Sequence, residues 1–185
     1  MKQPKVILIH GNGGSTGDGL WFPRVKQELE KLGLKVAAPT MPDNMLARES
    51  EWLPYIEDTL HADENTIIVG HSSGAVAAMR YAESHNIYGS ILIGACHTDL
   101  GDKDEKASGY YNRPWQWQKI KANQNWIVQF ASTDDPWIPI TEARHIHEQL
   151  KTDYREYTDK GHFGGDYEKT EFPKVVQVIR ERLAL

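Results

Sequence analysis

The 185-residue sequence has few of the features that mark exported or membrane proteins. It holds a single cysteine, Cys96, so no internal disulfide can form. Its first residues lack the apolar core and the small-residue cleavage site of a signal peptide. The early aliphatic run Val6-Ile7-Leu8-Ile9 is far shorter than the roughly 18 residues of a membrane helix. These absences predict a cytoplasmic protein with no membrane partner.

The charge is small and dispersed. There are 21 Lys and Arg residues against 26 Asp and Glu, a net charge of −5, and the two signs are mixed along the chain. Nucleic acids need a concentrated basic face, so we expect no nucleic-acid partner. The chain also lacks internal repeats, low-complexity tracts and a Pro- or Ser-rich linker. We therefore predict a single domain over residues 1–185.

Short apolar runs alternate with helical patterns along the chain. Several runs are continuously apolar, which is typical of strands buried on both faces of a parallel sheet. The pattern predicts an α/β protein, a three-layer sandwich whose mostly parallel sheet has about six strands. In such sheets ligands bind beyond the carboxyl ends of the strands. The predicted strands are residues 5–10, 34–38, 66–70, 88–94, 126–131 and 153–157, and apolar helix faces fall in 25–32, 52–60, 75–82, 143–150 and 172–183.

The third predicted strand runs into the motif Gly70-His71-Ser72-Ser73-Gly74, which matches G-x-S-x-G. In this motif a serine nucleophile sits on a sharp strand-to-helix turn, and side chains two positions to either side would collide. We therefore predict that Ser72 is a nucleophile. An ordinary glycine-rich turn between a strand and a helix is the alternative, and the apolar strand before the motif and the small-residue helix after it favour the nucleophile.

A serine nucleophile needs a base and an orienting acid, which follow it in the order acid, then histidine, in this fold class. Asp134 and Asp135 follow the fifth strand, and we favour Asp135 because its spacing to Ile138 and Pro139 anchors the loop on the sheet. Asp134 is then an acceptor that caps the loop. Of the eight histidines, His162 alone follows the last strand, and we predict that it is the base.

The oxyanion formed by nucleophilic attack requires two fixed donors. The backbone amide of Ser73 is one candidate, and the amide of Asn12, with its neighbour Gly13 as the alternative, is the other.

The sequence shows no cofactor or metal motif. The glycines after the first strand do not fit the dinucleotide-binding pattern G-x-G-x-x-G, and no Walker lysine follows them. His145 and His147 point to different faces of a predicted helix. We therefore expect no cofactor and no metal.

Aromatic residues gather in residues 96–117, which show no clear period. Tyr110, Trp115 and Trp117, together with Trp137 on a neighbouring loop, are either the wall or cap of a substrate pocket or an aromatic cluster under a loop. Both interpretations are open at this point. Cys96 ends a strand without a thiolate-stabilising arrangement, so we expect a small buried residue.

Several longer motifs stand out along the chain. They are Gly11-Asn12-Gly13-Gly14, Ala47-Arg48-Glu49-Ser50, Trp52-Leu53-Pro54, Gly70-His71-Ser72-Ser73-Gly74-Ala75, Ser108-Gly109-Tyr110, Arg113-Pro114-Trp115-Gln116-Trp117 and Thr133-Asp134-Asp135-Pro136. Together they resemble the retinoblastoma-binding protein nine family of small serine hydrolases. The resemblance runs over essentially the whole chain and implies a minimal α/β-hydrolase fold, with Ser72 as nucleophile, Asp135 as acid and His162 as base. The L-x-C-x-E pattern of that family falls on residues 60–64, where Ala62 replaces the cysteine, so retinoblastoma binding is not carried over.

These features predict a serine hydrolase that cleaves small carboxylic esters, thioesters or amides through an acyl-enzyme on Ser72. Its activity would be esterase-like or aminopeptidase-like. The alternative is a non-catalytic protein-interaction module that retains the hydrolase fold, because fold alone does not fix function.

Overall fold

The computed structural model describes residues 3–164 and 171–185. Its strands form one six-stranded sheet in the order β2-β1-β3-β4-β5-β6, and every neighbouring pair is parallel. This arrangement confirms the predicted parallel sheet. The strands are β1 (Lys5–Ile9), β2 (Val36–Ala37), β3 (Thr66–His71), β4 (Gly89–Ile93), β5 (Ile127–Ser132) and β6 (Asp153–Tyr157).

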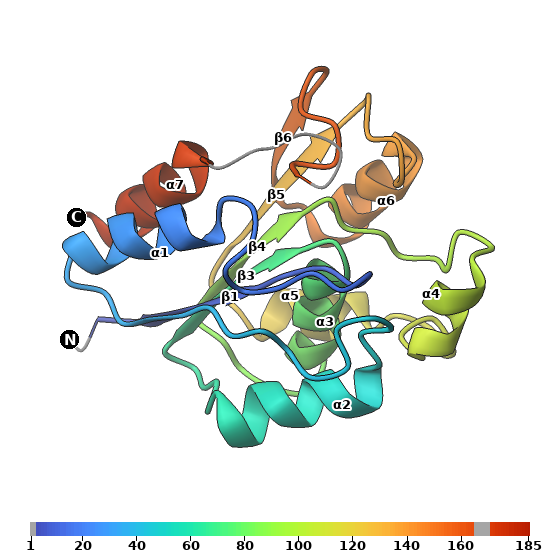
Figure 1. Ribbon diagram of the computed structural model, residues 1–185, viewed down its shortest axis with the longest axis horizontal. Helices are drawn as coiled ribbons and strands as arrows, with labels where there is room; N and C mark the ends of the chain where they lie inside the picture. The colour runs from blue at the N-terminus through green and yellow to red at the C-terminus, as the bar shows by residue number, and fades with distance from the viewer. Residues whose placement is uncertain (1–2, 165–170) are drawn as a thin grey trace.

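Helices cover both faces of the sheet, which confirms the three-layer sandwich. Figure 1 shows α1 and α7 side by side on one face, and α2, α3, α5 and α6 on the other. Within the described ranges, no helix has the length and apolarity needed to cross a membrane. The helices are α1 (Phe22–Lys31), α2 (Glu49–Pro54), the π-helix η1 (Tyr55–Thr59), α3 (Ser73–Ala82), α4 (Lys103–Ser108), α5 (Trp117–Ala122), α6 (Ile140–Leu150) and α7 (Pro173–Leu183).

The continuously apolar sequence of strand β1 is explained by the helices that cover both faces of the sheet. Val6 and Leu8 point to the layer formed by α1 and α7, whereas Ile7 and Ile9 point to the opposite layer around α3. All four side chains are fully buried. Because successive side chains alternate between the two faces, a strand covered on both sides needs apolar residues at every position.

Three details differ from the predicted elements. The edge strand β2 is only two residues long and pairs with β1 alone. Residues 96–117 contain the helix α4 and the start of α5, each of only six residues, which is too short for apolar periodicity to show. Within the apolar face predicted for residues 172–183, Val178 of α7 is buried, whereas Val176 is only partly buried.

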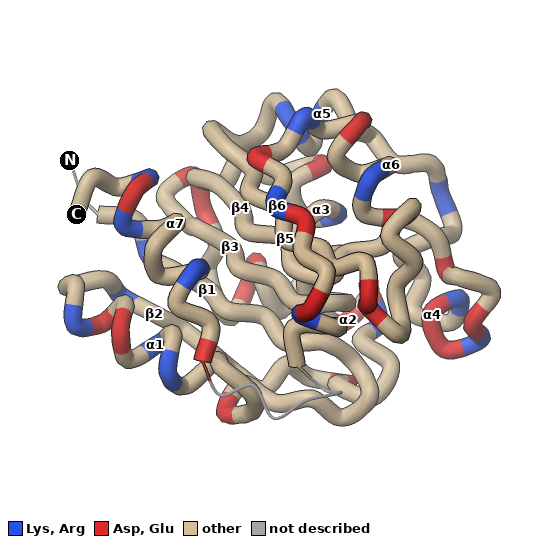
Figure 2. The backbone as a smooth tube through the Cα atoms, turned by 90° about the horizontal axis from the view of Figure 1, so that it is seen from above, with Lys and Arg blue, Asp and Glu red and all other residues tan. Residues whose placement is uncertain are grey.

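Charges of both signs are interspersed over the surface. Lys and Arg segments lie next to Asp and Glu segments on α1, α4 and α7 (Figure 2). On α1, Arg24 forms an ion pair with Glu28 at 3.5 Å, one helical turn away. Exposed pairs of this kind contribute little to stability, so the mixed pattern bears mainly on solubility.

Candidate active site

Ser72 lies on a strained turn between β3 and α3. Its backbone angles are φ 55° and ψ −123°, a conformation that non-glycine residues rarely adopt. A Cβ atom on Gly70 would lie 2.3 Å from the carbonyl oxygen of Gly74, and one on Gly74 would lie 2.3 Å from the carbonyl oxygen of Ile9. Both glycines are therefore required by close backbone contacts, as the motif predicts.

The loop that follows β1 passes directly beside this turn. A Cβ atom on Gly11 would lie 3.0 Å from Cβ of Ser72, so the glycine allows the loop to approach the serine. The neighbours of β1 in the sheet are β2 on one side and β3 on the other. The chain order reverses at this point, which is where open α/β sheets bind their ligands.

The loops after β5 and β6 bring Asp135 and His162 together. Oδ2 of Asp135 and Nδ1 of His162 are 2.7 Å apart, and their side chains are only 2% and 9% exposed. The other carboxylate oxygen, Oδ1, accepts the amides of Trp137 at 2.9 Å and Ile138 at 3.0 Å. Burial acts to raise the pKa of Asp135, but the hydrogen bond and charge of His162 and the two amides hold this pKa below its usual value. Asp135 is therefore a carboxylate at neutral pH.

This pairing fixes the state of the imidazole. A carboxylate can only accept, so Nδ1 of His162 carries the proton and Nε2 of the neutral ring is an acceptor. Asp134 has a different part: its Oδ1 accepts the hydroxyl of Ser132 and, at 2.9 Å, the amide of Gly161. Asp134 therefore joins the two loops, in line with the loop-capping role expected from the sequence.

Two residues that we did not predict also hold His162. Nε2 of His71 lies 2.6 Å from the carbonyl oxygen of His162, and the two rings are 4.8 Å apart. Burial, reinforced by the nearby His162, lowers the pKa of His71 to about 3, so this histidine is neutral and donates from Nε2. Gly94, just after β4, leaves room for the His162 ring, because a Cβ atom there would lie 2.9 Å from Cε1. In the sequence, the one feature that connects His71 and Gly94 with the site is that each stands at the carboxyl end of a strand.

The hydrogen bonds of the backbone amides distinguish Asn12 from Gly13 as the candidate oxyanion donor of the loop after β1. The amide of Gly13 already donates to the carbonyl of Met45 at 3.1 Å. In residues 3–164 and 171–185, the amides of Asn12 and Ser73 donate to no acceptor. Of the two neighbours, Asn12 and not Gly13 therefore has a free donor to offer.

The four predicted pocket residues have different surroundings. Tyr110 is 0% exposed and lies in the core. Trp115 is covered by the guanidinium of Arg80, 3.6 Å from its ring centre, and stacks on Trp117 at 5.3 Å. Trp115 and Trp117 are partly buried and pack against the core beneath them. Trp137 differs from them: it is 64% exposed and lies two residues beyond Asp135.

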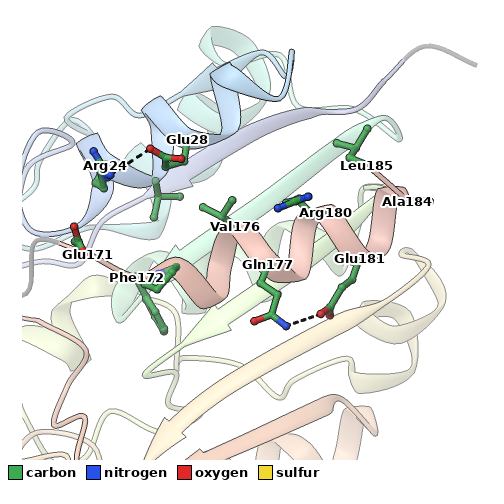
Figure 3. Close-up of a pocket in the computed structure, with 12 residues that line it drawn as sticks. Arg24, Glu28, Glu171, Phe172, Val176, Gln177, Arg180, Glu181, Ala184 and Leu185 are labelled. Carbon is green, nitrogen blue, oxygen red and sulfur yellow. Dashed lines mark hydrogen bonds and ion pairs between the residues drawn. The ribbon is translucent and has the colours of Figure 1, made fainter.

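Two cavities bear on the position of a ligand. One of about 310 Å³ is lined by the loop after β1, including Gly11, Ser15 and Leu20, and it adjoins Ser72 through Gly11. A larger groove of about 660 Å³ lies between α1 and α7, lined by Val25 and Val176 among others (Figure 3). The groove lies in the helical layer, away from the strand ends, whereas the smaller cavity lies in the loop that follows β1. Neither cavity is lined by the four aromatic residues above.

The remaining histidines and the cysteine have ordinary packing contacts. The ring of His145 stacks on His97 at 4.1 Å, whereas His147 stacks on Tyr154 at 4.8 Å, so the two helix residues do face apart. No group of three or more His, Cys, Asp or Glu residues in the described parts of the chain is arranged to hold a metal ion. Cys96 is buried, and burial raises the pKa of its thiol, as expected for an inert residue.

Comparison with known proteins shows the family to which this chain belongs. The family described as serine hydrolase matches residues 6–181. The serine hydrolase RBBP9 of Rattus norvegicus is 49% identical over 181 residues, which cover 97% of this chain and 95% of the rat protein. The chain belongs to the serine hydrolase family. The predicted family and hydrolase function are thereby confirmed.

Solved structures extend the comparison of this serine hydrolase. The crystal structure of the ydeN gene product of Bacillus subtilis superposes with a TM-score of 0.90 at 26% identity, and covers 99% of this chain and 100% of that one. Est1E of Butyrivibrio proteoclasticus has a TM-score of 0.75 at 15% identity, and covers 100% of this chain and 90% of that one. At that identity the likeness shows the fold alone. Together these similarities confirm the minimal α/β-hydrolase fold.

Proposed function

We propose that Ser72, His162 and Asp135 form a catalytic triad that cleaves small carboxylic esters, thioesters or amides. The observation that carries this proposal is the buried hydrogen bond between Asp135 and His162 beside the strained turn of Ser72. It supplies an imidazole with a fixed tautomer near a partly exposed serine on a strained turn, which is the arrangement that activates a serine.

In the proposed reaction, Oγ of Ser72 attacks the carbonyl carbon while Nε2 of His162 takes the hydroxyl proton. The amides of Asn12 and Ser73 donate to the oxyanion. The imidazolium then gives its proton to the leaving group, and water releases the acyl group by the same steps in reverse order. Within the described residues the Ser72 hydroxyl makes no hydrogen bond, so its contact with His162 belongs to the proposal.

The size of the cavity favours compact substrates. The cavity lined by Gly11, the neighbour of Ser72, has a volume of about 310 Å³, which is at the small end of ligand pockets. We infer an esterase or aminopeptidase-like activity in a cytoplasmic protein. A non-catalytic interaction module does not require an intact acid-base pair, so the bond between Asp135 and His162 favours an enzyme over that alternative.

Covalent labelling tests the proposal. A fluorophosphonate probe should label the purified protein, and Ser72→Ala should abolish both the labelling and the hydrolysis of p-nitrophenyl acetate. Ser84→Ala, at an exposed position just after the end of α3, is the matched control and should react like the wild type. Equal labelling of the wild type and Ser72→Ala would exclude Ser72 as the nucleophile.

A further inference from the structure

Glu105 connects α4 to the loop that follows β1. Its Oε1 accepts the side-chain amide Nδ2 of Asn12 at 2.7 Å, and its Oε2 accepts the hydroxyl of Tyr111 at 3.2 Å. Glu105 and Asn12 are 93 positions apart in the sequence. The bond therefore joins the short helix of residues 96–117 to the proposed oxyanion loop.

The cost of placing a carboxylate here indicates that the contact is specific. Glu105 is partly buried, and this burial raises its pKa, while the hydrogen bonds from Asn12 and Tyr111 lower it. Desolvating a carboxylate is unfavourable unless donors compensate for the lost water. Bonds between a neutral donor and a charged acceptor are about twice as strong as neutral ones, so the two donors offset part of this cost. Burial remains the larger effect, and the pKa of Glu105 is raised.

The rest of the loop is held by other contacts. The carbonyl oxygen of Asn12 accepts the hydroxyl of Ser15 at 2.8 Å, and the amide of Gly13 donates to Met45. These bonds fix the peptide group after Asn12. The amide before it, which is the proposed oxyanion donor, has no protein partner among the described residues. The carbonyl oxygen of this same peptide group, that of Gly11, accepts Nδ1 of His10 at 2.7 Å, because Nε2 of His10 is occupied by the amide of Met41. The side chain of Asn12 is a second group that restrains this residue, and Glu105 holds that side chain.

We propose that Glu105 is a positioning residue, which directs the free amide of Asn12 at the oxyanion by holding the Asn12 side chain. This proposal rests on the proposed function. The amide is useful only if it is fixed before the reaction, because donors that must reorient stabilise the transition state less. Glu105 itself touches no reacting atom, and it acts through Asn12 alone.

A kcat-against-KM measurement separates this role from a purely structural one. The oxyanion develops in the transition state, so loosening its donor lowers kcat and leaves KM nearly unchanged. Glu105→Ala should lower kcat on p-nitrophenyl acetate about 10- to 100-fold, with KM changed less than about twofold. Glu105→Gln keeps an oxygen acceptor for Asn12 and should restore most of the lost rate.

Asn12→Ala tests the same bond from its other end. It removes the side-chain amide but keeps the backbone amide, so it should lower kcat by a similar factor. The double variant with Glu105→Ala should lose no more than either single variant, because both remove one interaction. Asp104→Ala, an exposed acidic neighbour on α4, is the matched control and should keep the wild-type kcat.

The outcomes distinguish the two proposals. Wild-type labelling and hydrolysis with an unchanged kcat in Glu105→Ala would overturn the positioning role and leave the hydrolase intact. A similar loss in Asp104→Ala, or additive losses in the double variant, would also overturn it. If Glu105→Ala unfolds at the assay temperature, Asn12→Ala and Glu105→Gln decide the question alone. A wild type that neither labels nor hydrolyses the ester overturns both proposals.

Discussion

Gly94 lies directly against the ring of His162. A Cβ atom built on Gly94 would be 2.9 Å from Cε1 and 3.1 Å from Nδ1 of that ring. Gly94 also has a φ of 58°, in the left-handed region. The position therefore needs glycine for two separate reasons, the space for the imidazole and the conformation of the backbone.

Substitution of Gly94 should distinguish the effect of the lost space on kcat from the effect of backbone strain on stability. Gly94→Ala should displace His162 and lower kcat on p-nitrophenyl acetate about 10- to 100-fold, because an error near 1 Å in a catalytic group costs about this much. Gly101→Ala is the matched control: its φ is 74°, but no atom lies within 4 Å of the added Cβ. Both should lose roughly 1–2 kcal/mol of unfolding free energy in urea from backbone strain. Equal kcat values in the two variants would contradict the steric role.

The two neighbouring aspartates should differ sharply in their effect on rate. Asp135→Asn keeps the shape of the side chain but replaces the carboxylate that accepts the Nδ1 proton of His162. We expect kcat/KM for p-nitrophenyl acetate to fall roughly 10³- to 10⁴-fold, the loss seen when the tautomer of a triad histidine is wrong. Asp134→Asn still offers an oxygen to the amide of Gly161 and should lose less than about tenfold. If Asp134→Asn shows the larger loss, the assignment of the acid is reversed.

The turn at Ser72 could be predicted from the sequence because both required glycines stand at fixed positions of one short motif. Gly70 is required by the backbone of Gly74 within the turn, and Gly74 by the carbonyl oxygen of Ile9 on the neighbouring strand β1. The Asp135 and His162 pair was predictable in another way. Parallel strands end at one edge of the sheet, and chain order then decides which loops meet.

Contacts made by side chains from distant segments could not be predicted in this way. Glu105 lies on a six-residue helix whose sequence has no periodicity, and its partner Asn12 is 93 positions away. The role of His71 depends on a carbonyl oxygen 91 positions later. Likewise, an aromatic stretch such as that around Trp115 can line a pocket or pack inside, and the sequence does not reveal that Arg80 covers it.

Arg80 should account for much of the stability of residues 110–115. Its buried guanidinium forms an ion pair with Glu83 at 2.6 Å and donates to the carbonyl oxygens of Tyr110, Arg113 and Pro114. Arg80→Met leaves the buried carboxylate of Glu83 without its main partner. The unfolding free energy measured in urea should fall about 3–5 kcal/mol, as is usual when one member of a buried pair is removed.

Two further variants test this explanation. Arg80→Met combined with Glu83→Gln should recover part of the loss, because no unpaired charge then remains buried. Arg113→Ala removes a partly exposed ion pair with Glu49 and a longer one, at 3.6 Å, with Glu83, and should cost much less than Arg80→Met. A small loss in Arg80→Met, similar to that of Arg113→Ala, would show that the cluster does not depend on the buried guanidinium.

The buried neutral His71 predicts a loss of stability in mild acid. Its pKa falls from the usual 6.5 to about 3 in the folded protein, so between these values the unfolded chain binds a proton that the folded protein does not. Stability from His71 is therefore complete above pH 6.5 and declines as the pH falls toward 3. Between pH 6.5 and 4.5 this amounts to about 2–3 kcal/mol, at about 1.36 kcal/mol per unit. His71→Gln retains a donor for the carbonyl oxygen of His162 but does not titrate, so its urea-unfolding free energy should fall less steeply over this interval. Parallel curves for wild type and variant would show that His71 is protonated normally in the fold.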